Sequence, residues 1–294
     1  MHTLDREKIL QYFFERRDKE WENKQGTELI SSSGKEEPNT IPNVKIVSES
    51  ISTNSEMKEM LKAEELPAGT LLLTDFQTAG RGRQGKSFYS PKGMGLYFSI
   101  LTRPGQNQGN AILITTHAAV AVVRTIQELY GIELSIKWVN DLFYQGKKVC
   151  GILAEGKFQS NSGIYNGQGN SSNLEYCIMG IGLNLFTPAE GYPEEIKSIA
   201  GSLFGKFDDA KHADFDRNKL VATILYHYFS ICKEEEVLKE YCVKNLVLDK
   251  TVCFMENGVE VHGRVIEISS KGELRVKLED GEEKLVFSGE VHFL

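Results

Sequence analysis

Residues 78–100 read TAGRGRQGKSFYSPKGMGLYFSI, and the arrangement of the chain on either side depends on what this stretch is. Its glycines satisfy the dinucleotide-binding pattern G-x-G-x-x-G. The segment GRGRQGKS (80–87) also satisfies the phosphate-loop pattern G-x-x-x-x-G-K-[ST]. The two patterns make different demands on the residues that follow, and those residues decide between them.

Both motifs work by leading glycine-rich backbone into a helix whose N-terminus faces a phosphate. Here SPKGMG (90–95) follows instead, and then the apolar run LYFSILTR (96–103), which predicts a strand. We therefore interpret 80–85 as an anion clamp, in which glycines allow close backbone approach and the Arg81 and Arg83 guanidinium groups grip phosphate or carboxylate oxygens. Such a loop is expected to become ordered when its ligand binds. Taken alone, a solvated basic hairpin explains it too.

The composition is that of an ordinary globular protein of about two domains: 294 residues, 40% hydrophobic and 26% charged, with a net charge of -7. This acidic balance argues against a basic surface for nucleic acid. No apolar run approaches the ~18 residues of a membrane span. The N-terminus MHTLDREKIL carries charge where a signal peptide has an apolar core. We predict a cytoplasmic protein without membrane contact.

The cysteines and histidines give no sign of a metal or redox site. The five cysteines are scattered, with no C-x-x-C pair and no cysteine-histidine cluster at zinc spacing. His117 and His227 lie in helical apolar patterns and are interpreted as core or boundary residues. Buried, reduced thiols are expected, and no thiol or imidazole chemistry.

The chain divides into three predicted zones. Residues 1–43 combine a helix over about the first 14 residues with a polar linker. Residues 44–247 alternate strands and helices, which predicts a mixed α/β (α+β) domain. Residues 248–294 are short alternating strands broken at Asn-Gly, Lys-Gly and Asp-Gly pairs, which predicts a small SH3-like β-barrel.

Four features of the middle zone bear on its outline. A helix is predicted with a cap at Thr116 and a stop at Gly131. A hairpin is predicted to turn at Gln145-Gly146, and a polar loop to span 156–173. One long amphipathic helix is predicted over about 216–245.

The hairpin IKWVNDLFYQGKKVCGILAEG (136–156) gathers charged and amide groups. Lys137 and Lys148 offer two cations for phosphoryl oxygens, and Asp141, after Asn140, offers a carboxylate that suits Mg²⁺ beside a triphosphate. In isolation, an ordinary surface hairpin is the simpler explanation.

Two further stretches fit a ligand site. Ser52, Thr53 and Asn54 bring small polar groups to the start of a helix, although helix capping is the simpler explanation in isolation. Gly180 and Gly182 interrupt the strand MGIGLNL, as close approach of a ligand to the backbone requires.

In this order, these stretches resemble the biotin protein ligase family, from about Val44 to the C-terminus. The specific motifs are Q-x-A-G-R-G-R-x-G with S-P-x-G (77–93), K-W-x-N-D followed by K-x-x-G-I-L-x-E (137–155), and G-I-G-L-N (180–184). The resemblance implies a class II synthetase-like catalytic domain with a mixed central sheet, followed by the terminal barrel.

The resemblance also implies a two-step reaction. Biotin and MgATP give biotinyl-5'-adenylate and pyrophosphate, and the adenylate then acylates one lysine of a biotin carboxyl carrier protein. The implied substrates are biotin and ATP with Mg²⁺, without a tightly bound organic cofactor. Homodimers are common in the family.

The matched motifs imply roles for particular residues. Biotin binding is implied for Ser52, Thr53, Asn54, Gln77, Gly80, Arg81, Gly82, Arg83, Lys148 and Gly151. ATP binding is implied for Arg83, Phe88, Lys137, Asn140 and Asn184, and metal binding for Asp141. Arg81, Arg83 and Lys148 are the implied catalytic residues.

The chain departs from the family pattern at a few positions. Phe88 stands where many members have tryptophan, so weaker stacking on adenine is expected. Val139 replaces a proline before Asn140, and Cys150 replaces a small residue. Asp249 stands where glycine often begins the barrel, which concerns only the local turn.

Three alternatives stay open at this point. A lipoate or octanoate ligase shares the fold, and a non-catalytic biotin sensor is conceivable because of Phe88 and Val139. A transcriptional repressor is the third. The family helix resembling LDREKILQYF begins here at Leu4, which leaves no room for a preceding DNA-binding domain. A monofunctional enzyme without specific DNA binding is therefore expected.

Overall fold

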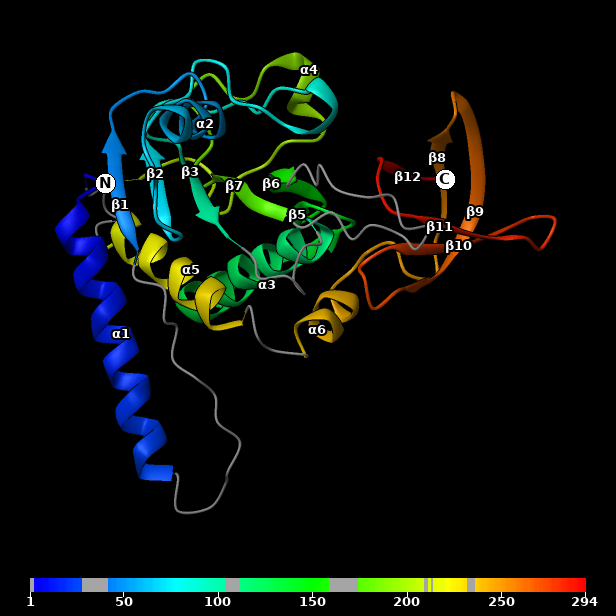
Figure 1. The fold of residues 1–294 in the computed structure, drawn as a ribbon. Coiled ribbons are helices and arrows are strands. Elements are labelled where there is room, and N and C mark those ends of the chain that lie inside the picture. Colours follow the sequence, from blue (N-terminus) through cyan, green and yellow to red (C-terminus); the bar gives the residue numbers. More distant parts are fainter. Residues whose placement is uncertain are drawn as a thin grey trace.

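The computed structural model describes residues 3–27, 42–103, 111–158, 174–208, 211–212, 214–231 and 236–294. A seven-stranded sheet in the order β1-β2-β3-β7-β6-β5-β4 forms its centre (Figure 1). Only β1 and β2 pair in parallel, so the sheet is mixed, as predicted. The strands are β1 (Asn43–Val47), β2 (Thr70–Thr74), β3 (Gly95–Thr102), β4 (Ser135–Lys137), β5 (Asp141–Tyr144), β6 (Lys147–Phe158) and β7 (Leu174–Asn184).

Helices cover both faces of this sheet (Figure 1). Alternate residues of β3 divide between two apolar clusters: Phe98 and Ile100 pack into the large core with α3, while Leu101 packs with Met57 of α2 on the opposite face. The period-two alternation of a strand explains this division. The helices are α1 (Arg6–Thr27), α2 (Thr53–Ala63), the 3₁₀ turn η1 (Arg83–Gly85), α3 (Ala111–Tyr130), α4 (Glu194–Lys197), α5 (Arg217–Ile231) and α6 (Val237–Val243).

Two predicted helix boundaries are wrong. α1 continues to Thr27, well past residue 14, and its Arg16 forms an ion pair with Glu128 of α3. Charged residues with good helix propensity carry the helix on where the apolar period stops. α3 begins at Ala111, ahead of the expected cap at Thr116.

The single long helix predicted over 216–245 is also wrong. The structure has two helices there, α5 and α6, and α6 packs against α3 (Figure 1). Both helices contribute apolar residues to the same core, so the spacing of hydrophobic residues does not show where one helix ends and the next begins. The predicted loop at 156–173 is partly wrong, because β6 runs to Phe158; residues 159–173 and most of the predicted linker lie outside the described residues.

One helix passes a length and hydropathy test for a membrane span. The segment Ile112–Tyr130 of α3 is long and apolar enough on average over 19 residues, although polar residues interrupt it and it is no continuous apolar run. However, 61% of its most apolar window is buried inside the fold. Val120, Val123 and Ile126 belong to the main core, which explains the composition.

A second sheet of five antiparallel strands follows, in the order β11-β10-β9-β8-β12. The glycines of its three predicted turns, Gly258, Gly272 and Gly281, all have positive φ, as tight turns require. Closure into an SH3-like barrel and the domain boundaries at 43/44 and 247/248 stay predictions. The strands are β8 (Thr251–Glu256), β9 (Val259–Ile268), β10 (Leu274–Leu278), β11 (Glu283–Val286) and β12 (Val291–Phe293).

The second sheet is attached to the first by a buried hydrogen bond and a shared core. Trp138 Nε1, just after β4, donates to Gly272 O in the β9–β10 turn at 2.8 Å. Val252 and Val276 belong to the same apolar cluster as the central sheet. The two sheets therefore pack as one body at this point, beside the β4–β5 edge.

The chain enters the second sheet through a conformation that favours glycine. Asp249 has a φ of 61°, and its N–H donates to Val265 O at 3.0 Å. A side chain in this left-handed region costs about 1 kcal/mol, whereas its exposed ion pair with Arg264 contributes little.

We expect Asp249→Gly to raise the free energy of unfolding by up to about 1 kcal/mol, measured by urea denaturation. Glycine keeps the N–H and removes the strained side chain. Lys250→Gly is the matched control: Lys250 is not among the residues with positive φ, so the change should lower stability. A loss of stability in Asp249→Gly would contradict this account of the turn.

Candidate functional site

One cavity brings together the residues that the sequence singled out. The space between its walls, including open solvent at its mouth, is about 900 Å³. All of the predicted site residues except Gly80 and Asn184 line it. Those that do are Ser52, Thr53, Asn54, Gln77, Arg81, Gly82, Arg83, Phe88, Lys137, Asn140, Asp141, Lys148 and Gly151.

The start of α2 forms a neutral, polar end of the cavity. Ser52, Thr53 and Asn54 are each about 97% buried or more. The Thr53 backbone N–H donates to Gln77 Oε1 at 2.9 Å, and Gln77 Nε2 donates to Ser90 Oγ at 2.9 Å. Ser52 is the N-cap residue of α2, yet its side chain makes no capping hydrogen bond. Capping therefore does not explain these three residues.

A carboxylate not predicted from the sequence holds this end in place. Glu155 on β6 accepts a hydrogen bond from Asn54 Nδ2 at 2.9 Å and forms ion pairs with Lys58 (2.6 Å) and Arg81 (3.2 Å). Burial raises the pKa of the Glu155 carboxyl, but hydrogen bonds from Lys58 and Asn54 outweigh burial and hold that pKa below its ordinary value. Glu155 thus stays ionised and fixes both Asn54 and the first clamp arginine.

The two clamp arginines, Arg81 and Arg83, interact with different partners. Arg81 turns to Glu155, while Arg83 Nη1 donates to Asn140 Oδ1 at 3.2 Å. Burial lowers the pKa of the Arg83 guanidinium, against the opposing effect of Asp141. A half-buried guanidinium that is held by a neutral amide is well placed to bind an anion.

The opposite end of the cavity is cationic. Lys148 Nζ lies 2.7 Å from Asp141 Oδ1 as an ion pair, although that buried oxygen receives no well-aligned hydrogen bond. Burial lowers the pKa of the Lys137 ammonium, and Asp141 opposes the shift. The lining holds five cations, Arg81, Arg83, Lys86, Lys137 and Lys148, against two carboxylates, Asp141 and Glu290. The excess of positive charge suits a polyanionic ligand.

The glycine loop is a tight turn rather than the start of a long helix. Gly82 N–H donates to Lys86 O at 2.7 Å, and Phe88 N–H donates to Gly80 O at 2.8 Å. A Cβ on Gly80 would lie 2.4 Å from Phe88 O, so only glycine fits there. Gly80 therefore shapes the loop without lining the cavity. β3 follows the loop, as predicted, and the expected ordering by ligand stays a prediction.

Gly180 and Gly182 of β7 line the cavity, as their predicted position beside a ligand requires, and they have a second use. They make room for the protein's own side chains: a Cβ on Gly180 would lie 2.3 Å from Asn54 Oδ1, and one on Gly182 would lie 2.4 Å from Phe88 Cε1. The Phe88 ring also lies over Gly151 on β6. The glycines thus form a floor on which Asn54 and Phe88 rest.

Asn184 lies outside the cavity lining. Its Nδ2 donates to Gly201 O at 3.0 Å, and its side chain is buried. The predicted nucleotide contact of Asn184 therefore stays a proposal that needs a shift of this amide.

The second sheet supplies residues that the sequence analysis missed. Gly289 and Glu290, just before β12, line the cavity, and Glu290 forms an ion pair with Lys86 of the glycine loop. Lys137 Nζ lies 5.5 Å from the centre of the Phe293 ring. No local pattern marks these residues, because their partners lie more than 150 positions away in the sequence.

The comparisons with known proteins all point to biotin or lipoate protein ligases. Residues 47–166 match the model of the Biotin/lipoate A/B protein ligase family. The bifunctional ligase/repressor BirA of Bacillus spizizenii is 35% identical over 175 residues, which cover 60% of this chain and 49% of BirA. The biotin--[acetyl-CoA-carboxylase] ligase of Mycobacterium tuberculosis is 28% identical over 187 residues, covering 61% and 60%. The chain thus spans about half the length of the curated relatives that it matches first.

The comparison with solved structures points to the same kind of protein. The biotin protein ligase of Aquifex aeolicus, determined in complex with biotin and ATP, superposes with a TM-score of 0.63 at 28% identity. The match covers 85% of this chain and 97% of that protein. The similarity therefore extends over the central sheet and beyond it.

The space above Gly180 can be tested by a substitution that fills it with a methyl group. Gly180→Ala should lower the free energy of unfolding by about 1–3 kcal/mol, because the new methyl group displaces Asn54 from Glu155 and Ser99. Chemical denaturation with circular dichroism measures the change.

Gly156→Ala is the matched control, since its Cβ would meet only the end of the Leu174 side chain, which can move. We expect the control to cost clearly less than Gly180→Ala. Equal losses in the two variants would show that Asn54 does not depend on the open space over Gly180.

Proposed function

We propose that the chain is a biotin protein ligase, a proposal supported by the match of residues 47–166 to the Biotin/lipoate A/B protein ligase family. In the proposed first step, a carboxylate oxygen of biotin attacks the α-phosphorus of ATP. The bond from that phosphorus to the bridging oxygen breaks, and pyrophosphate leaves. In the second step, the ε-amine of a carrier lysine attacks the acyl carbon of biotinyl-5'-adenylate, and AMP leaves with the anhydride oxygen.

The observation that carries the proposal is the polarity of the cavity. One end presents buried neutral groups at Ser52, Thr53 and Asn54, which suit the uncharged polar ring of biotin. The other end presents cations at Lys137 and Lys148, which suit a carboxylate and a triphosphate brought together. Two anions approach each other only where their charge is neutralised, so placement and charge supply the catalysis.

The residue roles follow from this polarity. Lys148 lies at the junction where carboxylate and α-phosphate meet, and Arg83 holds the adenylate once it has formed. Arg81, released from Glu155, closes the loop over the product. Exclusion of water matters because a mixed anhydride hydrolyses readily. Phe88, on its glycine floor, offers the nucleotide an aromatic edge.

Asp141 suits a magnesium ion brought in with ATP. Its buried Oδ1 receives no well-aligned hydrogen bond, and Mg²⁺ in nucleotide sites is held by one or two carboxylates together with the phosphates. When bound, the ion would neutralise phosphate charge. Asp141 would then exchange its ion pair with Lys148 for the metal, which leaves Lys148 for the biotin carboxylate.

The partners are proposed on the same basis. A biotin carboxyl carrier protein is the expected acceptor, because the reaction needs a lysine on a second protein. Cytoplasmic action, a possible homodimer and the absence of specific DNA binding stay predictions. Lipoate or octanoate in place of biotin is the alternative within the family, and a sensor that binds biotin without chemistry is the alternative outside it.

Carboxylate-dependent ATP–pyrophosphate exchange separates these alternatives. With Mg²⁺ and equal concentrations of biotin, lipoate and octanoate, we expect exchange with biotin alone. Exchange with lipoate or octanoate would move the protein to the other branch of the family. No exchange, in protein that binds biotin by calorimetry, would favour the sensor and contradict the ligase.

Two cavity variants should fail at different steps. Lys148→Ala should slow adenylate formation by about 100-fold or more, because a charge at the reacting atoms is lost. Arg83→Gly should form adenylate but release it quickly. Single-turnover assays with labelled ATP, followed by gel filtration, measure formation and retention.

Lys62→Ala is the matched control, since Lys62 is an exposed lysine on α2 whose ion pair with Glu59 lies outside the cavity. It should behave as the parent protein. Near-normal formation and retention in both cavity variants would contradict the assigned roles.

A further inference from the structure

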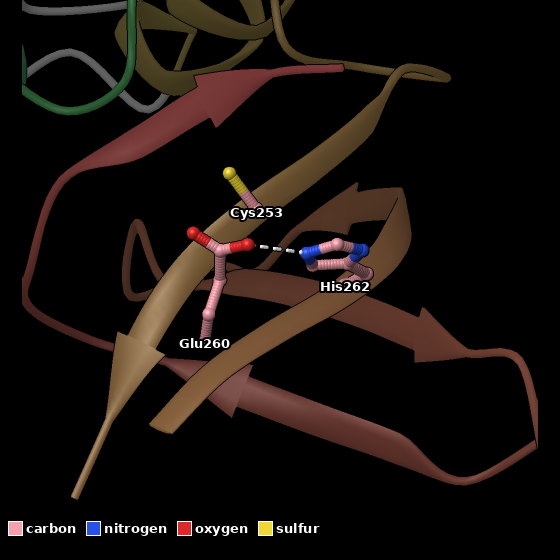
Figure 2. Close-up of side chains that lie close together, drawn as sticks. All are labelled: Cys253, Glu260 and His262. Atoms are coloured by element: carbon pink, nitrogen blue, oxygen red, sulfur yellow. Dashed lines mark hydrogen bonds and ion pairs between the residues drawn. The ribbon is translucent and has the colours of Figure 1, made fainter. Parts of the chain in front are cut away.

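Cys253, Glu260 and His262 come together on the second sheet (Figure 2), and none of them lines the cavity. One potential ligand atom from each, the Cys253 sulfur, a Glu260 carboxylate oxygen and a His262 ring nitrogen, lies within 4.8 Å of the other two. Across the part of the chain that the structure describes, no other group of three such side chains meets this distance. The sequence analysis found no cysteine-histidine cluster at zinc spacing, because strand pairing rather than a short motif brings these residues together.

The hairpin register explains why distant residues meet. The two-residue turn Asn257-Gly258 has positive φ at both positions, 51° and 81°, and sets Cys253 of β8 directly opposite His262 of β9. Glu260 lies two residues before His262 and so points to the same face. Val252 and Phe254, which alternate with Cys253, point into the core instead.

A second imidazole lies on the other side of the cysteine. β12 pairs with β8 so that His292 is directly opposite Cys253. Directly paired residues of an antiparallel ladder share a face, with Cβ atoms about 5 Å apart. Cys253 is therefore flanked by His262 and His292 in one row across three strands. At present His292 Nε2 lies 3.9 Å from Glu290 Oε2, so it reaches the cysteine by side-chain rotation.

We propose that Cys253, His262 and Glu260, completed by His292, form a site for Zn²⁺ or a similar divalent transition metal. Thiolate, imidazole and carboxylate are the usual zinc ligands, and four ligands satisfy its tetrahedral geometry. An ion pair between His262 and Glu260 at 2.8 Å accounts for those two residues but leaves the thiol between two imidazoles unexplained. Mg²⁺ prefers oxygen ligands, so this site and Asp141 select different metals.

Binding requires a defined exchange of protons. The Cys253 thiol loses its proton to solvent as the sulfur–metal bond forms, and each imidazole binds through an unprotonated nitrogen. The oxidation state of sulfur and metal does not change. Affinity should therefore rise with pH. Glu260 and His262 are exposed, which gives the ion a path to the buried sulfur.

Cobalt(II) titration of the full-length chain tests the site, because Co²⁺ reports thiolate and tetrahedral coordination by absorption. We expect one equivalent to produce a thiolate-to-cobalt charge-transfer band and intense d–d bands, both displaced by Zn²⁺. Cys253→Ser should abolish the charge-transfer band. His262→Asn and Glu260→Gln, both exposed and therefore tolerated by the fold, should weaken binding.

Cys242→Ser is the matched control, because Cys242 is another free cysteine with some exposure. It should leave the spectrum unchanged. His292→Asn should weaken binding while keeping the thiolate band; an unchanged affinity would remove His292 from the site. Absence of the thiolate band in the parent protein, or its persistence in Cys253→Ser, would overturn the proposal.

Discussion

The fold is organised around a concentration of positive charge inside one cavity. Arg81, Arg83 and Lys148 come from a loop and a strand that meet there. Without a ligand, each needs a partner, and the structure provides Glu155, Asn140 and Asp141 respectively. Pairing offsets the cost of withdrawing charge from water, a cost that applies to the half-buried Arg83 and Lys148 more than to the exposed Arg81. The same pairings keep the cations in position for a ligand whose anionic groups replace them.

The central sheet makes this arrangement possible. The neighbouring strands β5, β6 and β7 contribute residues to the cavity lining, and Gly151, Gly180 and Gly182 leave space there. Asn54 and Phe88 occupy that space, with contacts that a Cβ at Gly180 or Gly182 would block. The second sheet then closes the cavity through Glu290, and its own position is fixed by the hydrogen bond from Trp138 to Gly272. The site is thus made from both sheets, although most of it lies on one.

The sequence analysis could predict a ligand-binding role where the residues involved lie close together in the sequence. The clamp loop and the 137–148 hairpin were predicted as ligand-binding features, and both line the cavity. Glu155 was part of a quoted motif without a role, because its partners Lys58 and Arg81 lie about 100 and 75 positions away. Glu290 is farther still from Lys86. Such pairings depend on packing between elements, which local patterns do not encode.

For two features the structure adds what the sequence analysis did not contain. Gly180 and Gly182 were predicted to allow close approach of a ligand to the backbone, and both line the cavity, where Asn54 and Phe88 also lie against them. The Cys253–His262 pair did have a signal in the sequence. The Asn257-Gly258 turn was identified, and counting outward from it pairs Cys253 with His262. Zinc spacing rules drawn from short motifs do not include cross-strand pairs.

The most direct test of the central claim is a crystal structure of the protein after incubation with biotin and MgATP. The account predicts biotinyl-5'-adenylate in the cavity, with its ring at Ser52 and Asn54 and its acyl-phosphate junction between Arg83 and Lys148. It also predicts that Lys148 and Asp141 are separated in that structure. An adenylate bound elsewhere, or an intact Lys148–Asp141 ion pair with the adenylate in place, would contradict it.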